Sequence, residues 1–589
     1  MFCKVLSYWG KRSYYFLLLL VLLPCSNVFA KSPDLALYDV FETSIASNQS
    51  YRNPFDYKEV TLSGEFKSPN GEMYQVSGFY DGVVDAQQIW RIRFMPDIPG
   101  EWTYRLFPLG KKGTPQSGTF TVLDQVAHKG IRGHVKVDPK YPKYLMHDDG
   151  SPHYWVGGKW IAARDYGPPQ KEGEVNAGED PRSEVRIGWK SDEQLTQYLD
   201  LLLEYKHNGI LLKIALYPLE KDGISWDLEW IRRGEWLVNA AADRGIYVQV
   251  NFFDTWSRNK DFWFKNQMDG TGQPFNVWKT GDEHKKKNYI QTIVSRFAAF
   301  PNVYWELGNE MEHKPNCGTC FVELSNQYYI PWIKAADPYK LPIGLSEEIW
   351  RSADVDIGFL HQANKLDAAS WTKPVMMNEL VRYERPPSLF RTLLKKSPKF
   401  VRRTYKKIFG RDTLRGLWHD DAMNAPDLRF AYRRTFWTVF ALGGTGSSEA
   451  TWLYIDAPYS TAVRHVMRDH MHLASVLEKY APFLNQMTLI EGFVTNTSAK
   501  AVTRGLKGQL YLSYFDAGYE TDIDASQLAL NLPKGHYTAS WYDPRVGSSN
   551  RVDLEVSSSS TSLQSPGFNE DIVLIIERKP SGSSVLGPE

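Results

Sequence analysis

Cysteine is scarce in this 589-residue chain, which contains only four. Two of them lie within the first 30 residues, so only Cys317 and Cys320 remain in the rest of the chain. Two cysteines cannot complete a tetrahedral zinc site by themselves, and no His/Asp/Glu cluster has convincing metal spacing. No Gly-rich phosphate loop follows any predicted strand. The sequence therefore implies no metal and no cofactor.

An excess of charge of either sign is absent as well. Lys and Arg number 69 against 68 Asp and Glu, and the formal net charge of +1 gives no global reason to expect nucleic acid as a partner. Aromatic residues, in contrast, are abundant at 14%, with 20 Trp and 33 Tyr. Such an excess is typical of large cores combined with flat surfaces on which sugar rings can stack. The oligomeric state stays open.

The first 30 residues are typical of an export signal. A basic start, an apolar stretch and a small-residue cleavage site follow one another: Lys4, Lys11 and Arg12, then Tyr14–Leu23, then Val28–Ala30. The apolar stretch is too short for a comfortable transmembrane helix, so no stable membrane insertion is expected after cleavage. A lipid anchor on Cys25 is an alternative that Pro24 disfavours. We expect residues 1–30 to be removed and the protein to be exported, either to the periplasm or to the medium.

Two regions have the short alternating strands of β-sandwiches. Within residues 38–125, Gln88–Phe94 alternates apolar and polar side chains, and Pro96–Gly100 forms a turn before the next strand. This pattern predicts an N-terminal Ig-like β-sandwich. Residues 485–579 show the same rhythm and predict a C-terminal β-sandwich, followed by a Ser/Gly-rich tail at 580–589 that is expected to be disordered.

Between residues 140 and 484, apolar strands alternate with amphipathic helices. One helix begins near a capping box at Ser191–Gln194, and another spans about Trp226 to Gly245. Eight strand candidates fit: Tyr154–Gly157, Ile210–Leu216, Ile246–Phe253, Asn302–Leu307, Leu341–Leu345, Ile357–Leu360, Val375–Met377 and Gly446–Trp452. This number and spacing predict a central (β/α)8 TIM barrel, with a doubly wound sheet as the alternative.

Two of these strands end in a glutamate. The fourth strand runs into Gly308-Asn309-Glu310, and the seventh runs through Met377 and Asn378 into Glu379. Barrel enzymes work at the carboxyl ends of their strands, so both side chains are expected at one rim. A pair of carboxyl groups there suits glycosidic cleavage, in which one protonates the leaving oxygen and the other attacks from the opposite face. A strand-end cap or a salt bridge is the alternative role for either glutamate.

The string Trp305-Glu306-Leu307-Gly308-Asn309-Glu310 resembles the acid/base motif of clan A glycoside hydrolases. The resemblance implies Glu310 as acid/base, Glu379 as nucleophile, and retention of anomeric configuration. Within that clan the barrel is most similar to apiosidase-like proteins. The segments that carry this similarity are Asp148–Gly158 and Ala441–Gly446.

The flanking regions carry resemblances of their own. The N-terminal region resembles the Ig-like domain of unknown function that is often fused to such barrels. The C-terminal region resembles a collagen-binding-type β domain, most clearly at Trp541–Arg545.

Other strand ends supply weaker candidates for substrate binding. Asn309 is expected to hydrogen-bond a sugar hydroxyl beside the scissile bond, and His361 to orient the nucleophile, with a structural histidine as the alternative. Four further residues are expected to line the cleft: Asp254, Trp256, Trp160 and Trp452. Packing in a loop or in the core is the alternative role for each of them.

The stretch from Arg382 to Arg415 is unusually basic, with twelve Lys or Arg against two acidic residues. It follows the expected nucleophile, and it departs from the apiosidase-like resemblance. Arg and Lys at the cleft would suit sulfate or carboxylate groups on a polysaccharide. A solvated amphipathic helix and a membrane-surface helix are the alternatives.

The sequence thus predicts an exported retaining glycoside hydrolase that acts on a poly- or oligosaccharide, with an anionic glycan as one option and carbohydrate as the only expected partner. A non-catalytic carbohydrate-binding protein on a TIM barrel and a transglycosylase are the alternatives. Binding alone would need neither glutamate, whereas an added acceptor sugar would reveal a transglycosylase by its products.

In exported protein we expect Cys317 and Cys320 to form a disulfide, because oxidising compartments favour a loop-closing bridge and no thioredoxin-like unit surrounds the pair. So short a loop removes little entropy from the unfolded chain, so the effect on global stability should be small. Alkylation without reductant followed by mass spectrometry should find no free thiol. Two alkylated cysteines would contradict the prediction.

Overall fold

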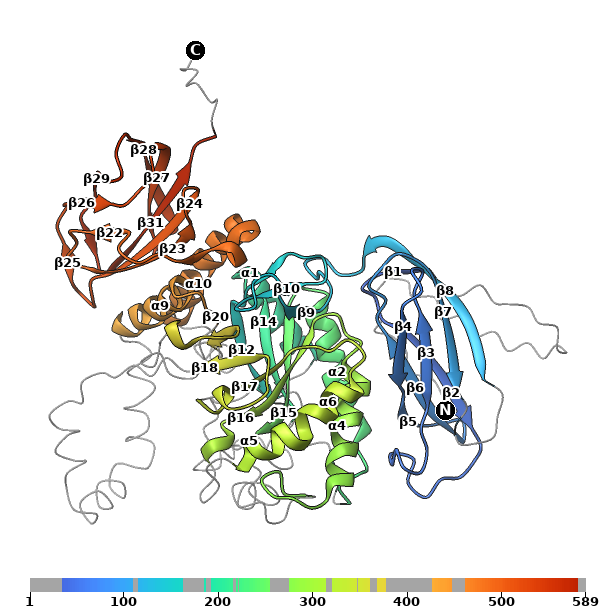
Figure 1. Cartoon of the computed structure of the whole chain (residues 1–589). Coiled ribbons are helices and arrows are strands. Elements are labelled where there is room, and N and C mark those ends of the chain that lie inside the picture. Colours follow the sequence, from blue (N-terminus) through green and yellow to red (C-terminus); the bar gives the residue numbers. More distant parts are fainter. Residues whose placement is uncertain are drawn as a thin grey trace, which may run out of the picture.

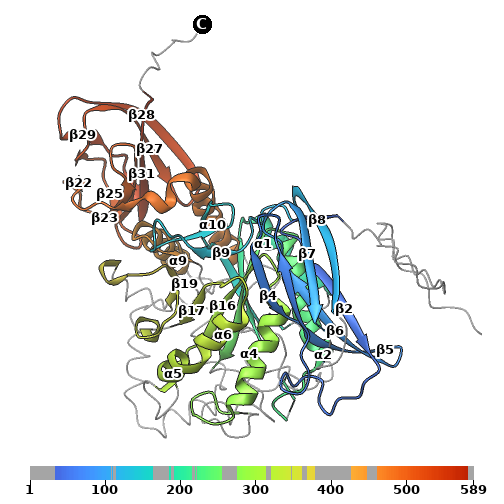
Figure 2. The ribbon, with the colours of Figure 1, turned by 45° about the vertical axis from the view of Figure 1, so that its right-hand side comes forward.

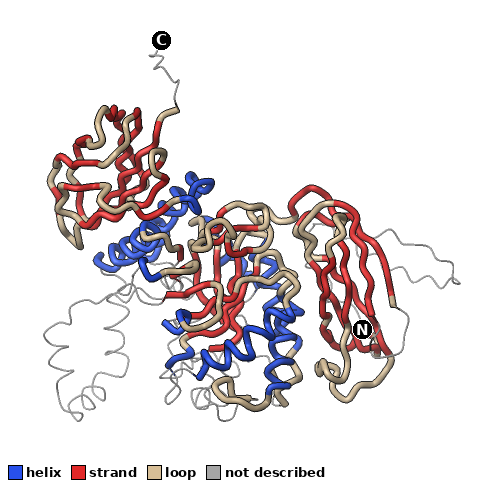
Figure 3. Tube along the Cα trace, in the orientation of Figure 1, coloured by secondary structure: helices blue, strands red, loops and turns tan. Residues whose placement is uncertain are grey.

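The computed structural model has three parts that follow one another along the chain (Figure 1): an N-terminal β domain, a central parallel sheet with helices, and a C-terminal β domain. This arrangement confirms the predicted multidomain fold. Helices lie in the central part and at its junction with the C-terminal domain (Figure 3). The described residues are 34–107, 109, 115–162, 185–186, 192–214, 219–220, 222–254, 275–313, 320–346, 348–360, 368–377, 426–446 and 461–580.

The N-terminal domain is a sandwich of two sheets, with strand orders β1-β8-β7-β3-β4 and β2-β6-β5. Alternation places Trp90, Ile92 and Phe94 of β6 in its core, where they are at most 1% exposed. Its strands are β1 (Leu35–Leu37), β2 (Phe41–Ser47), β3 (Ser63–Lys67), β4 (Met73–Ser77), β5 (Phe79–Val84), β6 (Gln87–Phe94), β7 (Gly100–Phe107) and β8 (Gln116–Val126).

The central sheet has the order β13-β12-β14-β15-β16-β17-β18-β19-β20, and all of its neighbouring strands are parallel. The N–H of Gly446 in β20 donates to the carbonyl of Trp155, just before β12, at 2.9 Å, so the two sides of the sheet meet. Eight strands therefore run around the barrel in chain order, and β13 is an extra strand beside β12. They are β12 (Gly157–Ala162), β13 (Val185–Arg186), β14 (Gly209–Lys213), β15 (Tyr247–Asp254), β16 (Val303–Asn309), β17 (Ile343–Ser346), β18 (Ile357–Leu360), β19 (Val375–Met377) and β20 (Thr445–Gly446).

The largest difference from the predicted strands is at the first one, which begins at Gly157 rather than Tyr154. Trp155 and Val156 are buried, as in a strand, but the main chain of Val156 is held by Asn208 instead. The Val156 N–H donates to the Asn208 side chain, and the Asn208 N–H donates to the Val156 carbonyl, both at 2.8 Å. The buried apolar residues just before this strand have the sequence pattern of a strand, so the strand was predicted to begin too early.

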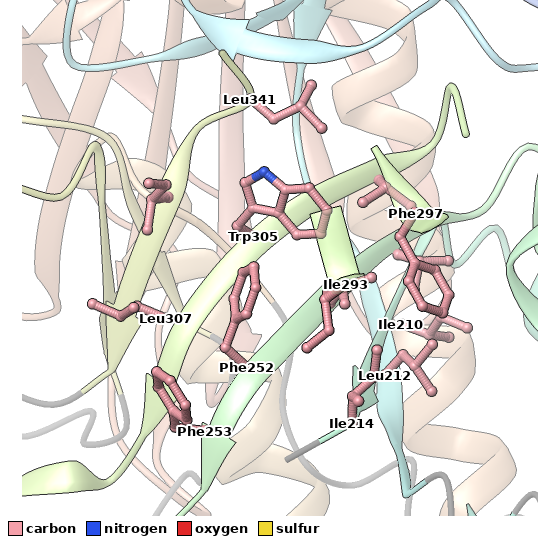
Figure 4. Close-up of a cluster of buried hydrophobic side chains, with 14 of the residues drawn as sticks. Ile210, Leu212, Ile214, Phe252, Phe253, Ile293, Phe297, Trp305, Leu307 and Leu341 are labelled. Carbon is pink, nitrogen blue, oxygen red and sulfur yellow. The ribbon is translucent and has the colours of Figure 1, made fainter. Parts of the chain in front are cut away.

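Helices cover the outside of the barrel sheet, and the layer between them is apolar. Figure 4 shows Phe252 of β15 and Trp305 of β16 in this layer, with Ile293 of α4. A capping bond begins α2, where the Asp227 carboxylate accepts from Trp230 N–H at 3.1 Å. The helices are α1 (Asp192–Glu204), α2 (Leu228–Ala242), α4 (Glu283–Phe297), α5 (Cys320–Leu324) and α6 (Ile330–Ala336), with a π-helical turn at Ser325–Tyr329 and short 3₁₀ turns at Met311–His313, Glu348–Arg351 and Ala368–Ser370.

The C-terminal domain packs its sheets in the orders β21-β23-β24-β31-β27-β28 and β22-β26-β29, with β25 and β30 paired separately. Two long helices, α9 (Pro426–Ala441) and α10 (Thr461–Tyr480), lie between this domain and the barrel (Figures 1 and 2), and a 3₁₀ turn at Ala481–Gln486 follows them. The strands are β21 (Thr488–Leu489), β22 (Val494–Thr495), β23 (Lys500–Leu506), β24 (Leu510–Asp516), β25 (Asp522–Ile523), β26 (Gln527–Leu530), β27 (Gly535–Asp543), β28 (Ser548–Val556), β29 (Thr561–Gln564), β30 (Phe568–Asn569) and β31 (Asp571–Arg578).

A buried ion cluster joins the N-terminal domain to the barrel helices. Arg296 of α4 is fully buried and donates to Glu235 of α2 at 2.7 Å and to Asp81 of β5 at 3.0 Å. Arg93 of β6 contacts the same Glu235. Burial opposes the ionisation of Asp81, but the Arg296 and Arg232 guanidiniums outweigh it and lower the pKa of Asp81. The first domain is therefore fixed against α2 and α4.

A second cluster joins the barrel to the C-terminal domain. Arg433 of α9 is buried and donates to Asp571 of β31 at 2.9 Å, to Glu570 at 2.7 Å and to Asp469 of α10 at 3.2 Å. Burial raises the pKa of Asp571 to about 6, although Arg433 acts in the opposite direction. Removing the arginine would leave buried carboxylates without their cation.

A small antiparallel sheet contributes two buried histidines next to barrel strands. The sheet consists of β9 (Val135–Val137), β10 (Leu145–His147) and β11 (Pro152–His153). The rings of His147 and His153 lie 4.8 Å apart, and each lies about as close to the ring of Tyr247 at the start of β15, at 4.9 and 5.1 Å. Burial, followed by the charge of Arg132, lowers the pKa of His147 to about 3.

His147 should make the protein less stable in acid. Its pKa is lower in the folded chain than in the unfolded chain, so the stability it contributes is complete above about pH 6.5 and falls as the pH drops toward 3. At pH 5 the loss is about 2 kcal/mol. Replacement His147→Phe should remove that part of the difference in unfolding free energy between pH 7 and pH 5, measured by urea titration. The exposed His536→Phe is the matched control, and equal pH dependence in wild type and His147→Phe would contradict the prediction.

Candidate active site

The site is organised around the end of β16, where a fully buried strand turns outward. All seven residues of β16 are buried, Asn309 being 1% exposed, and Glu310 follows as a partly exposed residue. The next residue, Met311, is 0% exposed. Glu310 is therefore a partly exposed residue between two buried ones, Asn309 and Met311.

The backbone of Glu310 is in the left-handed region, with φ of +50°. A non-glycine residue there is strained, and such strain is typical of functional sites. The N–H of Glu310 donates to the hydroxyl of Ser346 at the end of β17 at 2.7 Å, and that hydroxyl donates to the carbonyl of Gly308 at 3.1 Å. On the other side, the Trp278 indole N–H donates to the carbonyl of Met311 at 3.1 Å. Bonds on both flanks therefore hold the turn that carries the glutamate.

A row of polar residues lies inside the barrel below this turn. Lys213, Asn251 and Glu306 are register partners on β14, β15 and β16, and each is at most 1% exposed. The Asn251 amide donates to the Glu306 carboxylate at 2.7 Å. Their strand neighbours face the outer helices, so the alternation places this row in the interior.

Tyr304 lies one level further from the rim, on the same face of β16. Burial, followed by the charge of Glu306, raises the pKa of Tyr304 well above its ordinary value. The Tyr304 phenol therefore stays protonated, so the group below the polar row is uncharged.

The sequence prediction placed Asn309 and Glu310 at the carboxyl end of the fourth strand, and the structure has them there. Asp254 is the last residue of β15 and the register partner of Asn309, so its backbone lies beside the site. Trp160 is a correction: it lies within β12 as the register partner of Leu211, not after the first strand. The early start assigned to that strand caused the error.

Several predicted residues lie outside the described part of the chain: Glu379, His361, Trp256, Trp452 and Cys317. The strands that lead to two of them are described. Strand β18 ends at Leu360, one residue before His361, and β19 ends at Met377, two residues before Glu379. Cys320 is disulfide-bonded, and its pairing with Cys317 stays a prediction.

Four residues near the site were not singled out from the sequence: Lys213, Asn251, Glu306 and Ser346. A weak signal existed for the first three, because a polar residue in an otherwise apolar barrel strand points to the interior or the rim. A serine at the end of a strand gives no such signal. Among the described residues, no group of three or more His, Cys, Asp or Glu could hold a metal ion. In the same part of the chain, no helix is both long and apolar enough to cross a membrane.

Family models match two regions of the chain. Residues 174–378 match the cellulase model, glycosyl hydrolase family 5, and residues 34–107 match a domain of unknown function, DUF5060. The second match confirms the predicted kind of N-terminal domain. No curated protein sequence matches the chain. The specific likeness to apiosidase-like proteins and that of the C-terminal domain stay predictions.

Solved structures share the fold at low sequence identity. A candidate glycoside hydrolase from Bacteroides vulgatus ATCC 8482 is 18% identical with a TM-score of 0.62, covering 93% of this chain and 100% of that one. A glycoside hydrolase family 5 protein from the same organism is 13% identical with a TM-score of 0.48, covering 76% and 93%. The first shows that the three-part fold occurs as a whole in another protein.

Proposed function

We propose that this chain, whose residues 174–378 match the glycosyl hydrolase family 5 model, is a retaining glycoside hydrolase with Glu310 as its acid/base and Glu379 as its nucleophile. The observation that carries the proposal is the position of Glu310. It is a partly exposed carboxylic acid in a strained turn at the carboxyl end of the fourth barrel strand, within the matched region.

In the first step, a carboxylate oxygen of Glu379 attacks the anomeric carbon while the bond from that carbon to the glycosidic oxygen breaks. Glu310 gives its proton to the departing oxygen, so the leaving group departs as an alcohol. In the second step, Glu310 takes a proton from water as the water oxygen attacks the anomeric carbon and the ester bond to Glu379 breaks. Two inversions give net retention, and Glu310 is protonated again.

Asn309 is proposed to orient the sugar beside the bond that is cleaved. It precedes the acid/base directly and lies in register with Asp254 on the adjacent strand. The other proposed subsite residues are those predicted from strand ends, namely His361, Asp254, Trp256 and Trp452. Stacking on tryptophan and hydrogen bonds from short polar side chains are the contacts that a sugar ring requires.

Replacing either carboxylic acid by its amide should abolish most of the activity. Glu310→Gln and Glu379→Gln should each lower turnover of the natural glycan by several orders of magnitude, while circular dichroism stays that of wild type. With Glu379→Gly, azide should occupy the vacated position and give a glycosyl azide of inverted configuration. A crystal structure should place the carboxyl groups roughly 5–5.5 Å apart, since about 6.5–9.5 Å would favour inversion. A folded Glu379→Gln variant with wild-type turnover would refute the assignment.

The substrate is proposed to be an anionic glycan in an exported setting. The support is the cluster of twelve basic residues between Arg382 and Arg415, directly after the proposed nucleophile, in a chain whose total charge is nearly balanced. Simultaneous replacement of Arg402, Arg403, Lys406 and Lys407 by glutamine should raise KM for an anionic polysaccharide, and the effect should shrink as salt increases. Turnover of a small neutral aryl glycoside is the control and should change little. Equal effects on both substrates would contradict the proposal.

A further inference from the structure

We propose that Ser346 is the positioning residue that holds Glu310 in the conformation needed to donate its proton. This inference rests on the proposed function, because it takes Glu310 as the acid/base. Ser346 is the last residue of β17 and is 0% exposed, so it cannot touch a substrate itself. Its effect on the reaction must pass through the residues that its hydroxyl binds.

The direction of both hydrogen bonds follows from the chemistry of the groups. A backbone N–H can only donate, so the Ser346 hydroxyl oxygen accepts from Glu310 at 2.7 Å. A backbone carbonyl can only accept, so the single hydroxyl proton goes to Gly308 at 3.1 Å. One hydroxyl group therefore bridges the two residues on either side of Asn309.

This bridge replaces the ordinary strand pairing where β16 turns away from β17. The register pairs of the two strands are Trp305 with Ile343 and Glu306 with Gly344. Beyond them, Glu310 adopts its φ of +50°, a conformation that L-residues avoid because Cβ crowds the carbonyl oxygen. A conformation of this kind persists only where the surroundings impose it. The Ser346 hydroxyl supplies that constraint on the N-terminal side of the glutamate.

The constraint on the C-terminal side is independent of Ser346. Trp278 holds the Met311 carbonyl at 3.1 Å, and Met311 is completely buried. Loss of the Ser346 hydroxyl would therefore remove the bond that holds the Glu310 N–H, while Asn309 stays paired with β15 and Met311 stays anchored. The expected result is a rotation of the Glu310 backbone toward negative φ, which turns the carboxyl group away from the leaving oxygen rather than unfolding the loop.

A displaced acid should affect some substrates much more than others. A glycoside with a poor leaving group, such as phenol, needs the proton from Glu310, whereas 2,4-dinitrophenolate departs without it. A displacement of about 1 Å at a reacting group can cost on the order of 100-fold in rate. For Ser346→Ala we expect kcat/KM on the phenyl glycoside to fall roughly 10- to 100-fold, and on the 2,4-dinitrophenyl glycoside by less than about threefold.

The experiment compares these two aryl glycosides, made with the sugar that the wild-type enzyme cleaves. Ser346→Thr keeps the hydroxyl and should recover most of the loss. Ser325→Ala is the matched control. Ser325 lies between β16 and β17, is also 0% exposed, and its hydroxyl donates to a backbone carbonyl, that of Phe321. This control should leave kcat/KM unchanged on both substrates. A crystal structure of Ser346→Ala, which needs no substrate, should show a negative φ at Glu310.

The outcomes separate this proposal from the assignment of the acid/base. If Glu310→Gln shows the preference for the better leaving group but Ser346→Ala does not, Glu310 remains the acid and the role of Ser346 is refuted. If Glu310→Gln retains wild-type activity on both substrates, the proposed function itself fails. Equal losses on the two substrates in Ser346→Ala, or an unchanged φ of +50° in its structure, would also overturn the role of Ser346.

Discussion

The bond between the N–H of Gly446 and the carbonyl of Trp155 brings the last barrel strand against the first, and the geometry of the site depends on this closure. Only glycine fits there, because a Cβ at position 446 would lie 2.2 Å from the Met377 carbonyl oxygen, and φ is +139°. With the sheet closed, the carboxyl ends of all eight strands form one rim. Strands β16 and β19, which lead to the two proposed catalytic glutamates, are then three places apart around that rim.

The two flanking domains are extensions of this barrel rather than loosely attached modules. Each is joined to it by an arginine that is at most 2% exposed, Arg296 on α4 and Arg433 on α9, and each arginine contacts carboxylates from both sides of its interface. Breaking such a pair by removing one partner typically costs about 3–5 kcal/mol, because the remaining charge stays buried. Both clusters lie on the helix layer rather than at the rim. They can therefore fix the barrel helices without restricting access to the site.

The sequence was informative where a long pattern determines the structure and uninformative where a single contact does. Apolar runs separated by amphipathic helices predicted the barrel, and the position of Glu310 followed from its place after the fourth run. The start of the first strand was wrong because Trp155 and Val156 are as apolar as strand residues, and only the contacts with Asn208 distinguish them. Ser346 could not be predicted, since its role depends on which residue of the neighbouring strand turns toward its hydroxyl.

The polar row inside the barrel fixes the strand register, and the register determines where along the barrel axis Glu310 lies. A slip of one residue between strands would reverse every side chain. Lys213, Asn251 and Glu306 would then face the apolar helix layer, and Trp305 would turn into the interior. Burying charged and amide groups against apolar side chains costs several kcal/mol, so the slipped pairing is strongly disfavoured. The bond from Asn251 to Glu306 thus fixes the register of β15 against β16. Glu306 lies three residues before Asn309, the last residue of β16, so this register also fixes where the chain leaves the sheet before Glu310. Ser346 then sets the direction in which the chain turns, so the position and the direction of Glu310 are determined by two separate contacts.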